Sequence, residues 1–454
     1  MAGDVSSLII ALLLCLLWLI VLWDCRQYAQ LDSSSAPAIR HRLLRPRTPD
    51  DCPACRRQPI QPELVPAPPP AVRPWKEFKS RRGAPRRIMT DGFACPNHAC
   101  LYHGITDAQV HALVGDGTHG KHERIQTFRC QACGMTFTSR RDTPLYRRKT
   151  PSRRVAEVLS AVAEGLTVAA AGRVFGHSDG AITTWLTRAG EHSATLHDRW
   201  VRHLHLPHLQ LDELRTRLRS RAQVLWLWVA LDPLTKVIPV LHLGARTQNT
   251  AHGVVHELRS RLALDCLPVF TSDGLTLYFY ALTAHFGQWV TAVGHRARHW
   301  QLKPGLIYGQ VKKAYRRRQV VRVTRVMRCG TAEELRGALQ MLGLSGRLNT
   351  AFVERVNLTL RHGVAALARR TWATAQAAPS LLAHVEWWRG YYHCVRPHGS
   401  LRMSRPQPIE RGGRRRPQRY RQRTPAMAAG LTSRRWSVRE LLLVPLPPAP
   451  MRAG

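Results

Sequence analysis

The sequence predicts an α/β protein built from several consecutive parts, and three observations lead to this class. Two strand-like apolar runs occupy residues 224–232 and 236–243, and a third, 267–274, ends at a glycine turn. Apolar residues in 349–371 recur at the spacing of an amphipathic helix. With 454 residues, 44% of them apolar, the chain has the material for roughly two to four domains with packed cores. A wholly disordered polycation is excluded.

The chain is strongly basic, with 68 Lys and Arg against 29 Asp and Glu and a formal charge of +39. An enzyme that acts on small anionic metabolites does not need positive charge spread over several segments. The excess therefore favours a polyanionic partner, either nucleic acid or an anionic membrane surface.

An apolar segment near the N-terminus predicts a membrane anchor. Residues 5–23 carry no charge, and this length is about enough for a helix to cross a hydrocarbon core of roughly 30 Å. Asp4 precedes the segment and several arginines follow it, so the positive-inside rule places the rest of the chain in the cytoplasm. We therefore expect a transmembrane helix within 1–26, with a mis-assigned start codon or a buried helix as the alternatives.

Residues 27–90 are predicted to form a linker. The stretch 63–87 is rich in Pro and Arg and lacks the apolar periodicity of a folded element, which is typical of a stiff, extended chain. Cys52 and Cys55 stand in this region without a nearby partner pair. They could bind a metal between two molecules or have no role, and we expect no role.

Two close cysteine pairs, Cys95 with Cys100 and Cys130 with Cys133, predict a zinc ribbon at 91–148. In a reducing compartment such pairs are more typical of metal ligands than of disulfides. Four thiolates satisfy the tetrahedral coordination of a structural Zn²⁺.

Aromatic and histidine residues stand close to these pairs. Phe128 and Phe137 flank the second pair and could cover the metal. The first pair has four intervening residues where two are usual, so His98 or His103 could replace one of its cysteines. We expect both histidines to be ordinary loop residues.

Residues 149–200 predict a helix-turn-helix domain. Gly165 ends a first amphipathic helix, Thr167 can cap a second that ends at Gly176, and a third opens at 178–180. In such an arrangement the last helix enters the major groove of DNA. A small helical subdomain without DNA contact is the alternative. The candidate base-contacting residues are Thr183, Thr184 and Arg188.

Acidic residues are scarce here, so three of them near apolar runs are candidate metal ligands: Asp212, Asp273 and Glu354. Two carboxylates at strand ends and a third on a helix can converge on two divalent cations, and oxygen ligands suit Mg²⁺. Asp212 is followed by Glu213, and adjacent residues of a strand face opposite sides. We therefore expect only one of these two to point into the site, and the local pattern leaves open which.

Several segments together resemble the insertion sequence 1 family of bacterial transposases. They are LDEL at 211–214, the paired strands that end in ALDPLTKVIPV, GARTQNT at 244–250, TSDG at 271–274 and NTAFVERVNLTLRHGVAALARRT at 349–371. The resemblance runs from about Cys95 to about Leu401, and NTAFVERVNLTLR is its most specific element. The chain departs from the family at Arg215, where an aromatic residue is usual.

The resemblance implies a fold and an activity. Residues 201–405 would form an RNase H-like core, a mixed five-stranded sheet with flanking helices, with a basic insertion at 300–345. The chain would be a DDE-type DNA transposase that cleaves at element ends and joins them to target DNA. Asp212, Asp273 and Glu354 would hold two Mg²⁺ or Mn²⁺ ions.

The implied partners are double-stranded DNA, as element ends and target, and further copies of the chain in a homo-oligomer on DNA. We expect a cytoplasmic, DNA-associated protein that residues 5–23 could tether to the membrane. Asn349 and Arg355 flank the glutamate by the same resemblance. The expected DNA-binding residues outside the helix-turn-helix are Lys312, Lys313, Arg316, Arg317, Arg318, Asn349 and Arg355.

Residues 406–454 are predicted to form a basic, Pro-rich tail whose charge run either binds phosphate or is solvated. The aromatic cluster of Trp387, Trp388, Tyr391 and Tyr392 is more typical of a core than of a base-stacking surface. Two other functions stay open. The chain could be a membrane-tethered DNA-binding regulator or a catalytically retired relative of a transposase.

Overall fold

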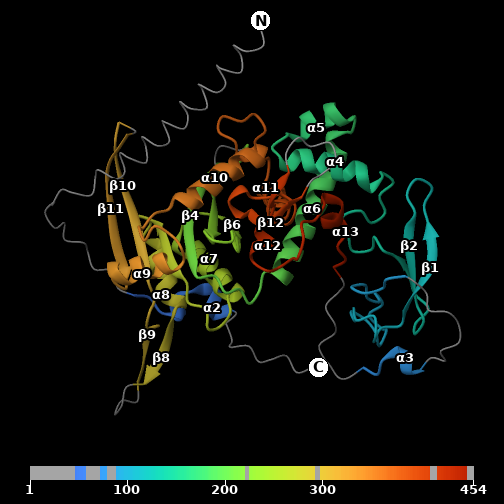
Figure 1. Cartoon of the computed structure of the whole chain (residues 1–454), viewed down its shortest axis with the longest axis horizontal. Coiled ribbons are helices and arrows are strands. Elements are labelled where there is room, and N and C mark those ends of the chain that lie inside the picture. The colour runs from blue at the N-terminus through green and yellow to red at the C-terminus, as the bar shows by residue number, and fades with distance from the viewer. Residues whose placement is uncertain are drawn as a thin grey trace, which may run out of the picture.

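A computed structural model of the chain (Figure 1) describes residues 46–57, 72–78, 88–219, 224–291, 297–317, 319–409 and 417–446. The expected membrane helix within residues 1–26 lies outside these ranges. Among the helices in the ranges, none combines the length and the apolar character that a membrane span requires.

A six-stranded mixed sheet forms the centre of the largest part of the molecule. Its order is β11-β10-β7-β4-β5-β6. β4, β5 and β6 form an antiparallel meander, β7 and β10 run parallel to β4, and β11 returns antiparallel along β10. The strands are β4 (His208–Arg217), β5 (Val224–Leu231), β6 (Val240–Gly244), β7 (Val269–Asp273), β10 (Tyr308–Arg316) and β11 (Gln319–Cys329).

This sheet corrects two details of the sequence prediction. It has six strands where five were expected, because the basic stretch after β10 folds back as β11. Residues 300–345 are not wholly an insertion, since β10 lies inside them and pairs with β7. The charge of this stretch masked its alternating strand pattern.

Helices cover both faces of the sheet because β5 is apolar on both sides. Trp228 and Ala230 face α7 (Gln248–Arg261) and α8 (Leu277–His285). Leu227 and Val229 face α10 (Ala351–Gly363) and α11 (Ala378–Cys394). A strand buried on both faces is a continuous apolar run, which is how β5 was recognisable in the sequence. A further helix, α9 (Ala332–Met341), packs against β7 and β10.

The three predicted helices of residues 149–200 are confirmed, with their caps. α4 (Ser152–Ala163) ends before Gly165, whose φ is 101°. Thr167 caps α5 (Val168–Phe175) through a hydrogen bond from the Ala170 N–H, and Gly176 ends it in the left-handed conformation. Ser178 caps α6 (Asp179–Trp200). Capping residues therefore mark these helix boundaries in the sequence.

The long helix α6 joins this helical region to the sheet. It crosses α11 so closely that a Cβ on Gly190 would lie 2.1 Å from the Ala383 carbonyl oxygen. Trp387 and Trp388 of α11 are fully buried, which confirms that these aromatic residues belong to the core. The two regions thus share one continuous packed interior.

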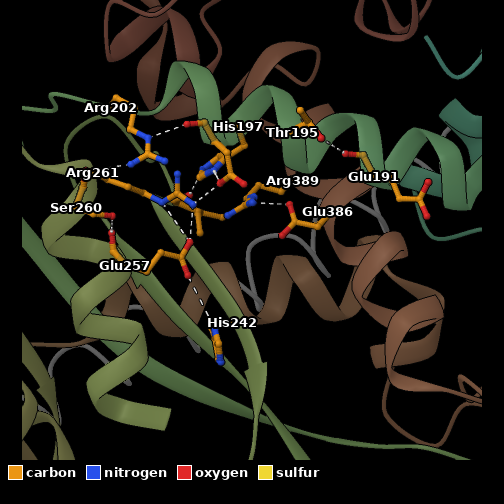
Figure 2. Close-up of polar contacts among 12 residues, drawn as sticks. Glu191, Thr195, His197, Arg202, His242, Glu257, Ser260, Arg261, Glu386 and Arg389 are labelled. Carbon is orange, nitrogen blue, oxygen red and sulfur yellow. Dashed lines mark hydrogen bonds and ion pairs between the residues drawn. The ribbon is translucent and has the colours of Figure 1, made fainter. Parts of the chain in front are cut away.

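A polar network also ties α6 to α7, and a buried ion pair within α11 lies near it (Figure 2). The Arg261 guanidinium of α7 donates to Asp198 of α6 at 2.7 Å and to Glu257 of its own helix at 2.5 Å. Nearby, Arg389 and Glu386 form an ion pair within α11 at 2.5 Å. Each charge is paired, as buried charges must be.

Part of the predicted C-terminal tail is folded. α12 (Pro425–Ala428) and α13 (Val438–Leu443) pack against α4, α6 and α11, with Val438, Leu441 and Leu442 buried. The basic composition hid this short apolar helix. The adjacent hairpin consists of β12 (Met403–Ile409) and β13 (Gln418–Arg421).

Part of the predicted linker is folded as well. η1 (Pro49–Asp51) and α2 (Pro53–Arg57) lie against α7 and α8, and α3 (Trp75–Phe78) packs on the cysteine-rich region. That region contains β1 (Leu113–His119), β2 (Ile125–Cys130) and β3 (Thr136–Thr138) and lies at the far side of the molecule from β11 (Figure 1). The remaining elements are β8 (Gly287–Thr291), β9 (Arg298–Leu302), η2 (Ala365–Leu367) and η3 (Gly399–Leu401).

Candidate functional site

An acidic cluster lies where two parallel strands of the sheet separate. β4 and β7 pair from His208 to Leu211, and β7 then ends at Asp273. Carboxylate oxygens of Asp212, Glu213 and Asp273 all lie within 4.8 Å of one another. The two predicted strand carboxylates are therefore neighbours in space.

The expectation that only one of Asp212 and Glu213 reaches the site is wrong. Both carboxylates approach Asp273 although the residues are adjacent on β4. Because the pairing with β7 ends at Leu211, β4 has a neighbouring strand only on its β5 side at this point, and side chains from both of its faces can reach the open edge.

Asp212 points towards α10. Its Oδ2 accepts a hydrogen bond from Asn357 Nδ2 at 2.7 Å, and its Oδ1 accepts one from the Glu213 N–H at 2.9 Å. Burial, followed by the nearby charge of Asp273, raises the pKa of Asp212 to about 7. The pKa of Asp273 is also raised, mainly by burial. Ionisation of these two carboxyl groups is therefore less favourable in the folded protein than in water.

Glu213 points towards different partners. It forms an ion pair with Arg246 and accepts a hydrogen bond from the Tyr278 hydroxyl at 3.3 Å, and its side chain is 2% exposed. Burial and Asp273 outweigh Arg246 and raise the pKa of Glu213 to about 8. Both neighbours thus lie beside Asp273 but have different further partners: Asp212 faces the helix that carries Glu354, and Glu213 also contacts α8.

Glu354 lies in the first turn of α10, whose start is fastened to β4. The Gln210 side chain donates to the Asn349 carbonyl oxygen at 2.9 Å and accepts from the Val353 N–H at 3.0 Å. Glu354 itself is outside the group of carboxylates that lie within 4.8 Å of one another. Its Oε1 accepts hydrogen bonds from Lys313 Nζ at 2.7 Å and Thr350 Oγ1 at 2.6 Å.

The predicted DNA-binding residues of α6 differ in accessibility. Thr183 and Thr184 are exposed on the first turns of the helix. Arg188 is half-buried and donates to the Tyr146 carbonyl oxygen at 3.3 Å, so its guanidinium is occupied within the chain. The accessible candidates on this helix are therefore the two threonines.

The predicted basic cluster at residues 312–318 has an exposed part and a half-buried part. Arg316 and Arg317 are exposed at the tip of the β10–β11 hairpin, whereas Lys312 and Lys313 are half-buried near the sheet. Lys313 contacts Glu354 and so belongs to the acidic site rather than to a free surface. Arg318 lies outside the described residues.

The two residues that flank Glu354 in the sequence have separate environments. Asn349 lies just before the N-cap of α10, and its Oδ1 accepts a hydrogen bond from the Ala351 N–H at 3.2 Å. Arg355 is exposed on α10. Only Arg355 therefore presents its side chain freely enough to bind a phosphate.

The four cysteines of the predicted ribbon come together and could bind zinc. Their sulfur atoms all lie within 4.8 Å of one another, with Cys95 and Cys133 3.6 Å apart and Cys100 and Cys130 3.8 Å apart. A tetrahedral Zn²⁺ with Zn–S bonds of about 2.3 Å separates two sulfurs by about 3.8 Å.

The surroundings of these cysteines agree with the sequence prediction. Phe128 and Phe137 are buried beside them, as expected of a cover. The rings of His98 and His103 contact each other at a tilt of 41° and are not members of the ligand group. Gly134 has a φ of 76°, which lets its N–H turn back to the Cys130 carbonyl oxygen at 2.8 Å.

A second group of four donors was missed in the sequence. Cys52 and Cys55 meet His256 of α7 and His285 of α8, with all four ligand atoms within 4.8 Å of one another, and this cluster also could bind zinc. The partners lie about 200 residues away in the sequence. A weak signal was available in the pair His252 and His256, four residues apart on one helix face, of which only His256 joins the group.

Comparisons with known proteins do not assign the chain to a family. No protein-family model matches it, and no curated protein is significantly similar to it. Inference about its function therefore depends on the geometry and chemistry of its own residues.

Proposed function

We propose that the chain is a metal-dependent DNA strand transferase of the DDE type, with Asp212, Asp273 and Glu354 as its catalytic carboxylates. One observation carries the proposal. Adjacent parallel strands bring Asp212 and Asp273 together, and the helix that carries Glu354 is hydrogen-bonded to one of those strands. In a chain of formal charge +39, buried carboxylates with raised pKa values are typical of a functional site.

The strand arrangement supports an RNase H-like core. An antiparallel meander, β4 to β6, is followed by two strands that join the other side of β4 in parallel. α7 connects β6 to β7, and α8 follows β7 directly. β11 is then an addition to a five-stranded core.

The donors fit Mg²⁺ or Mn²⁺, since carboxylate oxygens are the preferred ligands and a divalent cation would offset their mutual repulsion. When bound, two such ions activate an attacking oxygen and stabilise a leaving oxygen at a phosphodiester. The chain's own residues hold the ligands in place. Asn357 orients Asp212, and the Leu275 N–H donates to Asp273 Oδ1 at 3.0 Å.

Glu354 would have to change its partner before it could bind a cation. Its carboxylate is bound to Lys313, so it must leave this ion pair to join Asp212 and Asp273 around a cation. Glu354 is about half exposed, and such ion pairs contribute only about 0.2–1 kcal/mol, so the exchange is energetically easy.

The DNA would bind over a wide surface. The exposed threonines of α6, Arg355 beside the acidic cluster and the hairpin arginines Arg316 and Arg317 are spread across the molecule. Contacts with phosphates at several of these places predict a steep fall of affinity with salt.

Strand transfer can be tested with the DNA that flanks the gene. Purified protein and Mg²⁺ are incubated with a plasmid that carries both flanks, and joined products are sequenced. Wild-type protein should join the flank ends to new sites. Asp273→Asn should abolish joining and leave DNA binding in gel shifts within about twofold, because it removes one cation ligand and no phosphate contact.

Asp265→Asn is the matched control, because Asp265 is an aspartate of the same region with an 80% exposed side chain. It should behave as wild type. If the Asp273→Asn protein still joined DNA, the assignment of the catalytic carboxylates would be refuted. Binding of the flanks without joining by any form of the protein would instead favour a retired transposase that acts as a DNA-binding regulator.

A further inference from the structure

The group formed by Cys52, Cys55, His256 and His285 has no part in the proposed DNA chemistry. We propose that it is a second structural zinc site, which fastens residues 46–57 to helices α7 and α8. Two thiolates and two imidazoles are a frequent ligand set of structural Zn²⁺. The ligands come from two separate parts of the chain, so the metal would act as a long-range cross-link.

The distances match a tetrahedral ion. Cys55 Sγ lies 3.1 Å from His285 Nε2 and 3.3 Å from His256 Nδ1, and Cys52 Sγ lies 3.5 Å from His285 Nε2. With Zn–S and Zn–N bonds of about 2.3 and 2.05 Å, a tetrahedral Zn²⁺ separates sulfur from nitrogen by about 3.6 Å. A small expansion of the cluster is enough to admit the ion.

Additional hydrogen bonds orient the ligands. The Nδ1 of His285 lies 2.7 Å from the Ala281 carbonyl oxygen, so it carries the proton and leaves the Nε2 lone pair directed at the two sulfurs. The Cys55 N–H points to Cys52 Sγ at 3.4 Å, which is the contact expected for a thiolate. Both features favour metal-binding forms of these groups.

The N-terminal segment needs such a cross-link. η1 and α2 have three and five residues, far below the length at which an isolated helix is stable. Among residues 46–57, Cys52 alone is buried. The other contacts are modest: the Arg47 N–H donates to Thr283 Oγ1 at 3.0 Å, and its guanidinium lies over the Tyr280 ring.

The site is separate from the acidic cluster. α8 follows the Asp273 turn closely, and Tyr278 in its first turn contacts Glu213, whereas His285 is its last residue. The helix of nine residues spans about 14 Å at 1.5 Å per residue. The proposed zinc would hold the end of α8 that lies away from the carboxylates.

The test is the zinc content of the full chain, purified without oxygen and measured by mass spectrometry of the metal. Wild-type protein should contain two zinc ions per chain. The double variant Cys55→Ser, His256→Gln should contain one, as should Cys130→Ser with Cys133→Ser in the ribbon. Cys329→Ser is the control, because Cys329 lies outside both groups, and it should keep two.

Hydrogen exchange separates loss of the site from general unfolding. In the Cys55→Ser, His256→Gln protein, amides of residues 49–57 should lose protection while those of β4 and β5 keep theirs. A zinc content that the Cys55→Ser, His256→Gln double variant leaves unchanged, or a disulfide between Cys52 and Cys55 in the anaerobic protein, would overturn the inference. These measurements do not involve DNA, so their outcome does not depend on the proposed function.

Discussion

The cysteine clusters and the acidic cluster differ in how completely the fold assembles them. In each cysteine cluster, four donor atoms already lie within 4.8 Å of one another. In the acidic cluster, Asp212, Glu213 and Asp273 are together, but Glu354, the third predicted catalytic carboxylate, is outside the group and is bound to Lys313.

The physical reason is charge. Thiols and imidazoles can pack together as neutral groups, so a fold can bring them together at little cost. Carboxylates ionise near pH 4 when they are free, and their repulsion opposes close approach. The comparison therefore distinguishes two donor groups that are already assembled, and could bind zinc, from a proposed carboxylate site that would be completed only when a cation binds.

The largest expected effect concerns the ribbon. Replacing Cys130 and Cys133 by serine should unfold residues 95–138. The hydrophobic cluster of this region is small, and zinc binding in such modules contributes about 10–16 kcal/mol to the free energy of folding. Hydrogen exchange should show lost amide protection in β1 to β3 with protection retained in the central sheet. Protection that survives without zinc would show that this cluster is not a structural metal site.

The next effect concerns stability without divalent cations. The pKa of Asp212 is about 7 in the folded protein, above the value of 3.8 for the unfolded chain. Folding therefore favours the protonated carboxyl group, and the free energy of unfolding falls as the pH rises from about 3.8 to about 7. At pH 8, Asp212→Asn should therefore stabilise the cation-free protein, by at most about 4 kcal/mol. The amide oxygen of Asn can still accept the hydrogen bond from Asn357.

Chemical denaturation at pH 4 and pH 8 measures this difference. The gain should be large at pH 8, nearly absent at pH 4, and reduced at pH 8 by Mg²⁺, which stabilises only the wild-type site. Asp265→Asn should change neither value because its carboxylate is exposed. An Asp212→Asn protein less stable than wild type at pH 8 would contradict the view that the carboxylates repel one another.

The smallest effect concerns Lys313. Replacing it by methionine should strengthen Mg²⁺ binding by about 1.5- to 5-fold, because the cation no longer competes with an ion pair of about 0.2–1 kcal/mol for Glu354. Calorimetric titration measures the change. Arg316→Met is the control, since Arg316 is exposed at the tip of the β10–β11 hairpin. Weaker binding in Lys313→Met would mean that the lysine supports the site.

Local patterns in the sequence predicted the elements whose causes are local. The helices of residues 149–200 begin and end at capping residues such as Thr167 and Gly176, and the structure has them there. The four ribbon cysteines lie within 39 consecutive residues, and they meet. The strand runs of β5 and β6 were also recognisable, because burial on both faces produces an uninterrupted apolar sequence.

Features that depend on distant partners could not be predicted in this way. α13 has only six residues, and its apolar side chains matter only because α4 and α11 lie beside them. The partners of Cys52 and Cys55 come from helices about 200 residues further along. No spacing rule connects such positions, since the fold alone decides that they meet.

The sequence by itself determined which chemical groups are available: scarce carboxylates in or near apolar runs, paired cysteines, and an excess of positive charge. Tertiary structure decided which of them act together. It placed both Asp212 and Glu213 beside Asp273, bound Lys313 to Glu354, and turned an unpaired Cys-x-x-Cys motif into half of a four-ligand cluster. The reason is that side-chain type and local conformation are properties of short segments, whereas metal ligation and charge pairing depend on distances that only the packed chain sets.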